Sequence, residues 1–203
     1  MGEQDQEVLM RAFEFHGHKC WACTAGVRAG MAALGALGVT RTGSADELHC
    51  IVEIGDNHGA QCFADGVQYA TGCTLGKHNI EKAGWGKLAL TLIDKRRQRS
   101  VRVSYKATHQ KKIAESAFMR KRALGISPTE IPEGEAWEIV EIIWKASESE
   151  VLAVGEVKPH PFSDYGEIMG LKPCAECGEV TSIAYLRVVG ERHVCTPCSG
   201  YSD

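Results

Sequence analysis

The pattern of apolar and polar positions along the chain predicts a mixture of helices and strands. Apolar side chains recur at helical spacing over residues 5–15, 21–37, 60–70, 111–124 and 135–146. Shorter runs rich in branched apolar residues predict strands over residues 48–54, 88–94, 100–105 and 151–157. We therefore expect an α+β fold in which helices pack on a mainly antiparallel sheet.

The predicted helix over residues 21–37 consists mainly of alanine and glycine. Each glycine inside a helix costs up to about 1 kcal/mol relative to alanine, so a run of them needs a compensating contact. Small side chains allow another helix, a sheet or a second copy of the chain to approach closely. The composition predicts such a contact but leaves open which of the three it is.

Two histidines and two cysteines lie within eight positions, from His16 to Cys23. On an extended backbone His16, His18 and Cys20 would point the same way. Cys20 would also stand at the N-terminus of the next helix, where the helix dipole favours a thiolate. The spacing predicts a transition-metal site. Two alternatives remain: Cys20 and Cys23 form a redox dithiol, or these side chains are only packed in the fold.

A second cluster of reactive side chains begins in the helix predicted over residues 60–70. Cys62 and Asp65 are spaced for one face of that helix. The loop that follows carries a thiol, a hydroxyl and an ammonium group, from Cys73, Thr74 and Lys77. Such a combination indicates a binding pocket, and the alternative is an ordinary solvated loop.

The C-terminal region contains Cys174-x-x-Cys177 and Cys195-x-x-Cys198. This arrangement is typical of a closed zinc site with four cysteine ligands, and residues 181–189 would form hairpin strands between the pairs. A closed site contributes folding energy and leaves no position for a substrate. The polar stretch 158–170 predicts a linker, so we expect a core domain over residues 1–160 and a zinc finger over residues 165–203.

Composition and charge exclude several classes of protein. The 203 residues carry a net charge of −3, which gives no general attraction to nucleic acid or to anionic membranes, and no apolar run is long enough to span a membrane. The nine cysteines are odd in number and partly arranged in metal-type pairs, which does not suit a disulfide framework. We expect a cytoplasmic protein with reduced thiols.

Four segments resemble the motifs of the FmdE family, which is named after formylmethanofuran dehydrogenase: residues 15–20, 62–68, 71–79 and 86–87. The resemblance implies an α+β core that forms homodimers, and a His/Cys pocket able to bind a transition metal. It also implies an association with molybdenum or tungsten formylmethanofuran dehydrogenase, and a C-terminal zinc finger of the treble-clef type in some members. This chain departs from the family pattern at one point. Residues 20–23 stand where the family has Cys-Pro-Gly, and this replacement adds a thiol.

We predict a metal-binding protein with a transition metal in its core site and a structural zinc in its finger. The metal ligands are predicted to be His16, His18, Cys20, Cys62, Cys174, Cys177, Cys195 and Cys198. The core metal would be zinc, with nickel, iron or copper as competitors. If the protein is an enzyme of one-carbon metabolism, catalysis is predicted to use Cys20, Asp65, Cys73 and Lys77, and cofactor or substrate binding to use Thr74 and Lys77. A non-catalytic accessory subunit or metal carrier is the main alternative.

Overall fold

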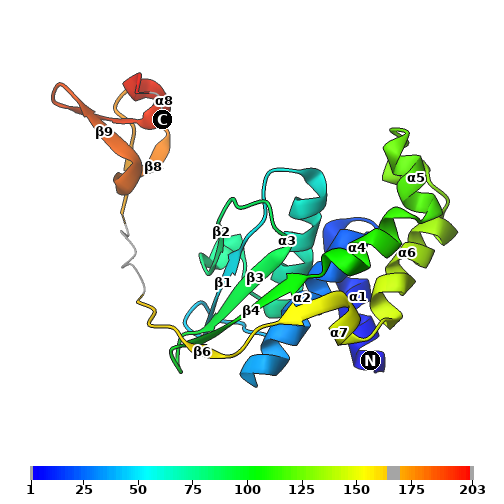
Figure 1. Cartoon of the computed structure of the whole chain (residues 1–203). Coiled ribbons are helices and arrows are strands. Elements are labelled where there is room, and N and C mark those ends of the chain that lie inside the picture. Colours follow the sequence, from blue (N-terminus) through cyan, green and yellow to red (C-terminus); the bar gives the residue numbers. More distant parts are fainter. Residues whose placement is uncertain (1, 164–169, 202–203) are drawn as a thin grey trace. The chain divides into compact units, whose positions relative to one another are not determined.

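The chain folds into two units in the computed structural model, which describes residues 2–163 and 170–201 (Figure 1). The first unit ends at Phe162. The predicted linker begins later than expected, because Lys158–Pro159 pairs with a strand of the first unit. The ring of Phe162 also lies 4.7 Å from that of His49. The first residues of the polar stretch therefore belong to the N-terminal unit, and residues 164–169 lie outside the described part.

A mixed sheet forms the centre of the N-terminal unit. Its strands are β1 (Leu48–Val52), β2 (Ile80–Lys82), β3 (Ala89–Asp94), β4 (Arg99–Tyr105), β5 (Leu152–Val154) and β6 (Lys158–Pro159). Their order is β2-β1-β3-β4-β5, with β6 beside β4. All pairs are antiparallel except β1 with β2, which confirms the predicted mainly antiparallel sheet. The parallel pair is possible because a helix crosses over between those two strands.

Helices pack against this sheet and against one another. They are α1 (Glu3–His16), α2 (Trp21–Leu37), α3 (His58–Thr71), α4 (Ala107–Ala114), α5 (Ala117–Ala123), α6 (Glu133–Lys145) and α7 (Glu148–Val151), with short 3-10 turns at Leu75–Lys77 and Pro128–Glu130. Helix α2 packs on β3 and β4, α3 packs along α2, and α1 contacts both helices. No helix in residues 2–163 or 170–201 is long and apolar enough to cross a membrane.

The predicted helix over residues 111–124 is instead two helices, α4 and α5. Ser116 causes the break, because its Oγ accepts a hydrogen bond from the Met119 backbone N–H at 3.2 Å and so starts a new helix. A capping serine inside a helical pattern is a start signal that the apolar periodicity does not show. The two short helices place Phe118 and Met119 near the N-terminus of α2.

The small residues of α2 permit close contact with α3. A Cβ atom at Gly26 would lie 2.0 Å from the Phe63 carbonyl oxygen, and one at Gly66 would lie 2.1 Å from the Cys23 carbonyl oxygen. Two backbones approach this closely only where both lack side-chain atoms. Gly26 and Gly30 of α2 therefore serve an internal helix–helix contact, which also brings Cys62 of α3 towards the start of α2.

The C-terminal unit consists of two short antiparallel ribbons and a helical turn. Its elements are β7 (Leu171–Pro173), β8 (Val180–Ser182), β9 (Leu186–Val189), β10 (Arg192–Cys195) and α8 (Thr196–Ser199), with a 3-10 turn at Ile183–Tyr185. Strand β7 pairs with β8 and β9 pairs with β10, so the predicted hairpin over residues 181–189 is divided between two ribbons. The buried cluster is small and consists of Cys174, Val194 and Cys195.

Candidate metal centres

The first candidate centre lies at the turn between α1 and α2. His16 is the last residue of α1, and Gly17 closes that helix in the left-handed conformation with φ of 93°. The Gly17 N–H donates to the Phe13 carbonyl at 2.7 Å. Cys20 is extended and forms the N-cap of α2. His16 is therefore helical and not extended as expected, because the glycine confines the bend to the residues between the two helices.

Three potential ligands meet at this turn: His16, Cys20 and Cys62. Their donor atoms lie within 4.8 Å of one another, and both cysteines are buried. Cys62 comes from α3, so two distant segments form the group. The fourth predicted ligand, His18, lies outside it, and its ring centroid is 4.4 Å from that of His16.

The group fits a transition metal in its donor chemistry. The Nε2 atom of His16 is buried and has no hydrogen-bond partner among the described residues. A buried nitrogen without a partner is costly, and a bound cation would satisfy it. One imidazole and two thiolates suit zinc, nickel, iron or copper.

Asp65 orients His16 from the other side of the ring. One Asp65 carboxylate oxygen lies 2.8 Å from Nδ1 of His16, so Nδ1 carries the proton and Nε2 is left for a metal. The Gln68 amide donates to the other Asp65 oxygen at 3.4 Å. The Leu75 N–H in turn donates to Gln68 at 3.4 Å. Gln68, which was not predicted as a site residue, thus connects the loop after α3 to the candidate centre.

The two sulfur atoms of the group differ in acidity. Cys62 lowers the pKa of Cys20 as its hydrogen-bond partner, burial opposes this, and the backbone N–H groups of Cys23 and Ala22 lower it further. The pKa of Cys62 is raised by Cys20 and by burial. Cys20 is therefore the more acidic thiol of the pair. Burial also raises the pKa of Cys23, which has no exposed surface and stays protonated.

A cavity of about 360 Å³ adjoins this group. Cys20, Cys62, His18 and His58 lie along one side of it, and its remaining wall is mainly apolar with Trp21, Phe118, Met119 and Pro128. His58 is a functional candidate that the sequence did not reveal. Its spacing of four residues from Cys62 could have indicated a shared helix face. The helix was expected to begin only at Ala60, which placed His58 outside it.

The other predicted site residues lie apart from the three ligands. Cys73 is fully buried in the main core, and burial raises its pKa to about 11. The Lys77 ammonium donates to the Gly72 carbonyl, and the Thr74 N–H donates to the Asn79 side chain at 2.9 Å. These groups stabilise their own loop, and Gln68 connects that loop to the centre through Asp65. Their role in catalysis or binding stays a prediction.

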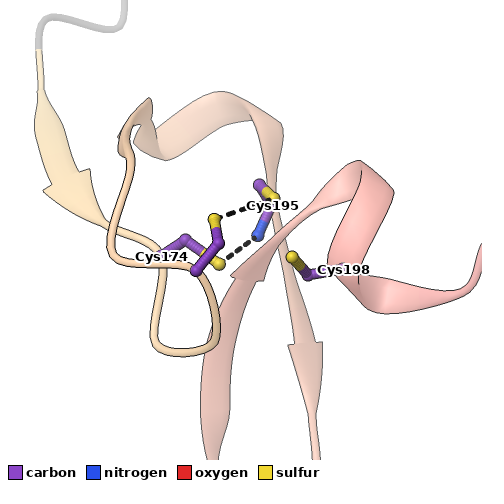
Figure 2. Close-up of side chains that lie close together, drawn as sticks. Cys174, Cys195 and Cys198 are labelled. Carbon is purple, nitrogen blue, oxygen red and sulfur yellow. Dashed lines mark hydrogen bonds between the residues drawn. The ribbon is translucent and has the colours of Figure 1, made fainter.

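The second candidate centre is the four-cysteine group of the C-terminal unit. The sulfur atoms of Cys174, Cys177, Cys195 and Cys198 lie within 4.8 Å of one another. Figure 2 shows three of these side chains directed towards a common point. The Cys177 and Cys195 sulfurs are 3.9 Å apart. Two thiolates on a tetrahedral zinc, with Zn–S bonds of about 2.3 Å, stand about 3.8 Å apart.

Backbone groups prepare Cys174 of this group for metal binding. The Cys195 N–H donates to the Cys174 sulfur at 3.3 Å, and the Glu176 N–H donates to it at 3.4 Å. The backbone N–H groups of Cys177 and Cys195 are the main cause that lowers the pKa of Cys174 to about 6. The group therefore has the geometry to hold a metal ion such as zinc.

Comparisons with known proteins agree with this architecture. A probable S-adenosyl-L-methionine-binding protein of Archaeoglobus fulgidus is 29% identical over 212 aligned residues, which cover 95% of this chain and 52% of that protein. The chain thus spans about half the length of this curated relative.

A crystal structure of a tungsten formylmethanofuran dehydrogenase FmdE-like protein from Syntrophus aciditrophicus has a similar fold. Its TM-score is 0.60 at 21% identity, and the match covers 97% of this chain and 92% of that one. The family described as FmdE, molybdenum formylmethanofuran dehydrogenase operon, matches residues 15–153, a range that includes His16, Cys20 and Cys62. The chain therefore belongs to the FmdE family.

Proposed function

We propose that the chain binds two metal ions, one in the core and one in the C-terminal unit. His16, Cys20 and Cys62 hold a transition-metal ion, and the four C-terminal cysteines hold a structural zinc. The observation that carries the core site is the buried Nε2 of His16, which lacks a hydrogen-bond partner among the described residues and lies within 4.8 Å of two cysteine sulfurs. The donor set matches borderline metals such as zinc, nickel and iron.

Three protein ligands beside a cavity suit a site with an exchangeable position. Catalytic zinc sites commonly have three protein ligands and one open position, whereas structural sites are closed. A metal bound here would supply a Lewis acid at the wall of the 360 Å³ cavity. Asp65 holds the proton of His16 at Nδ1, and the apolar wall limits the access of water. The same features serve a metal carrier, which also needs a position where an acceptor can attack.

The family suggests a role beside formylmethanofuran dehydrogenase-type enzymes. Its description refers to the molybdenum formylmethanofuran dehydrogenase operon, and the similar crystal structure is of a protein named after the tungsten enzyme. We propose that the chain acts with such an enzyme in one-carbon metabolism, as an accessory metal protein or a catalyst. A homodimer, which the family resemblance implies, is part of the same proposal.

The dithiol alternative stays open, but the grouping of Cys20 with His16 and Cys62, which does not include Cys23, favours the metal site. Cys23 has no exposed surface, and its pKa is raised by burial, followed by the charges of Cys20, Asp65 and Cys62. In thiol–disulfide exchange the attacking thiolate must be accessible, and the second thiol needs only to reach the first. Cys20 is the only one of the two that borders the cavity among the described residues.

Metal content per chain tests the core site directly. We expect two metal equivalents in the full-length protein and one in Cys62→Ser, because the C-terminal cysteines keep theirs. Elemental analysis after gentle purification measures both. Cys23→Ser is the matched control, since it removes a neighbouring buried thiol outside the ligand group, and it should retain two equivalents. One equivalent in the wild-type protein, unchanged in Cys62→Ser, would overturn the proposal.

We expect Asp65→Asn to weaken the core site without abolishing it. The amide no longer supplies a charged acceptor for the His16 Nδ1 proton, and loss of such outer partners typically lowers metal affinity about 10–100-fold. Competition with a chromophoric chelator measures the affinity. Asp46→Asn makes the same change on an exposed carboxylate in a turn and should leave it unchanged. Equal affinities in the two variants would show that Asp65 does not support the ligand.

A further inference from the structure

His16, Cys20 and Cys62 give a tetrahedral ion three donors, and two further imidazoles border the cavity beside them. We propose that His58 is the fourth, displaceable ligand of the core metal. This inference rests on the proposed core site and specifies how its exchangeable position is closed.

The distance from His58 to the nearest ligand is that of two donors on one ion. Its Nε2 lies 3.7 Å from the Cys62 sulfur. With Zn–S bonds of about 2.3 Å and Zn–N bonds of about 2.0 Å, tetrahedral geometry separates the two donors by about 3.5 Å. The imidazole is thus already placed beside Cys62 as a second ligand would be.

The helix that carries both residues explains this placement. His58 is the first residue of α3, and Cys62 follows one helical turn later. Side chains four residues apart project from the same side of a helix, and paired ligands at this spacing bind a single zinc ion in other proteins. The first turn of α3 can therefore supply two ligands without rearrangement of its backbone.

His18 is the competing candidate, and its surroundings are different. The ring centroid of His18 lies 4.4 Å from that of His16, with the rings tilted by 37°, whereas the Nε2 of His58 lies beside a sulfur. Neither imidazole lies within 4.8 Å of all three donors, so either ring has to turn to complete the site. His58 is solvent-exposed, while Cys20 and Cys62 are buried.

Exposure makes His58 the ligand that leaves most easily. An exposed ring can rotate without opening the core, whereas removal of a buried thiolate disrupts packing between α2 and α3. A small molecule with a nitrogen, sulfur or oxygen donor that enters the cavity would meet the metal where His58 leaves it. His58 would then regulate access to the metal, and His16, Cys20 and Cys62 would retain it.

Cobalt(II) titration of the metal-free full-length protein tests this assignment. The core spectrum is defined as the absorption that Cys62→Ser loses relative to the wild type. In His58→Ala we expect this spectrum to shift and the core affinity to fall at least about tenfold, since even outer partners have effects of this size. Added imidazole should restore the wild-type spectrum in His58→Ala by filling the vacated position.

His18→Ala is the matched control, because it removes the other imidazole at the cavity. It should keep the wild-type core spectrum and affinity. A wild-type spectrum and affinity in His58→Ala, or a loss that occurs in His18→Ala instead, would overturn the role of His58. If Cys62→Ser loses no absorption at all, the core metal site itself fails, and that result is distinct from failure of the His58 assignment. Far-ultraviolet circular dichroism of each variant verifies that α3 is intact.

Discussion

Gly26→Ala is expected to destabilise the N-terminal unit severely and to weaken its metal site at the same time. The new methyl group would lie 2.0 Å from the Phe63 carbonyl oxygen, which belongs to the backbone of α3 and cannot rotate away. Overpacking of a core typically costs about 1–3 kcal/mol, and a backbone clash belongs at or above the upper end of that range. Because Cys62 immediately precedes Phe63 on α3, displacement of the helix also separates Cys62 from Cys20.

Gly35→Ala provides the matched control in the same helix. Outside its chain neighbours and the backbone of its own helix, no atom of the described residues lies within 4 Å of the position that its Cβ would take, so the substitution should be neutral or stabilise by up to about 1 kcal/mol. Denaturant unfolding measures both free energies, and metal analysis of the folded fraction measures the coupling to the site. Equal stability of the two variants would show that α2 and α3 are less closely packed than the structure indicates.

Most helices and strands could be predicted from the sequence, because the spacing of apolar residues indicates which face of each segment is buried. The spacing of Val27 and Leu34 in α2, and of Leu90 and Leu92 in β3, reflects burial against the hydrophobic core. What the pattern could not give was pairing between distant segments. The parallel contact of β1 with β2 and the break at Ser116 depend on a crossover and on one capping hydroxyl, neither of which changes the apolar period.

The residue types of the candidate centre could be predicted from the sequence. The full set of neighbouring side chains could not, because it depends on the geometry of the fold. Cysteine and histidine are common metal ligands, so Cys20 and Cys62 could be grouped from the sequence. Whether His58 approaches Cys62 depends on where α3 begins, and helix ends are the least certain feature of a sequence pattern. His58 therefore emerged only from the structure. Polar loop residues such as Lys77 also bond to their own backbone, which residue type alone does not reveal.

Loss of metal from the four-cysteine group is expected to unfold the C-terminal unit and leave the N-terminal unit folded. Among the described residues of this unit, the buried cluster contains only Cys174, Val194 and Cys195, and all nine cysteines of the chain are free thiols. Chains of about 40 residues or fewer usually need metal ions or disulfides to fold. A structural zinc contributes about 10–16 kcal/mol of binding free energy in comparable peptides, which becomes folding free energy.

Cys195→Ser in the full-length protein removes one ligand and should have this effect. We expect limited proteolysis to cut within residues 171–201 of this variant, and of the wild type treated with a strong chelator, while the N-terminal unit stays resistant. Val180→Thr is the control, since Val180 is 73% exposed and threonine keeps its branched shape, so that variant should resist cleavage. A protected C-terminal unit in Cys195→Ser would mean that the small apolar cluster suffices for folding. A structural metal would then no longer explain why the sulfur atoms of the four cysteines converge.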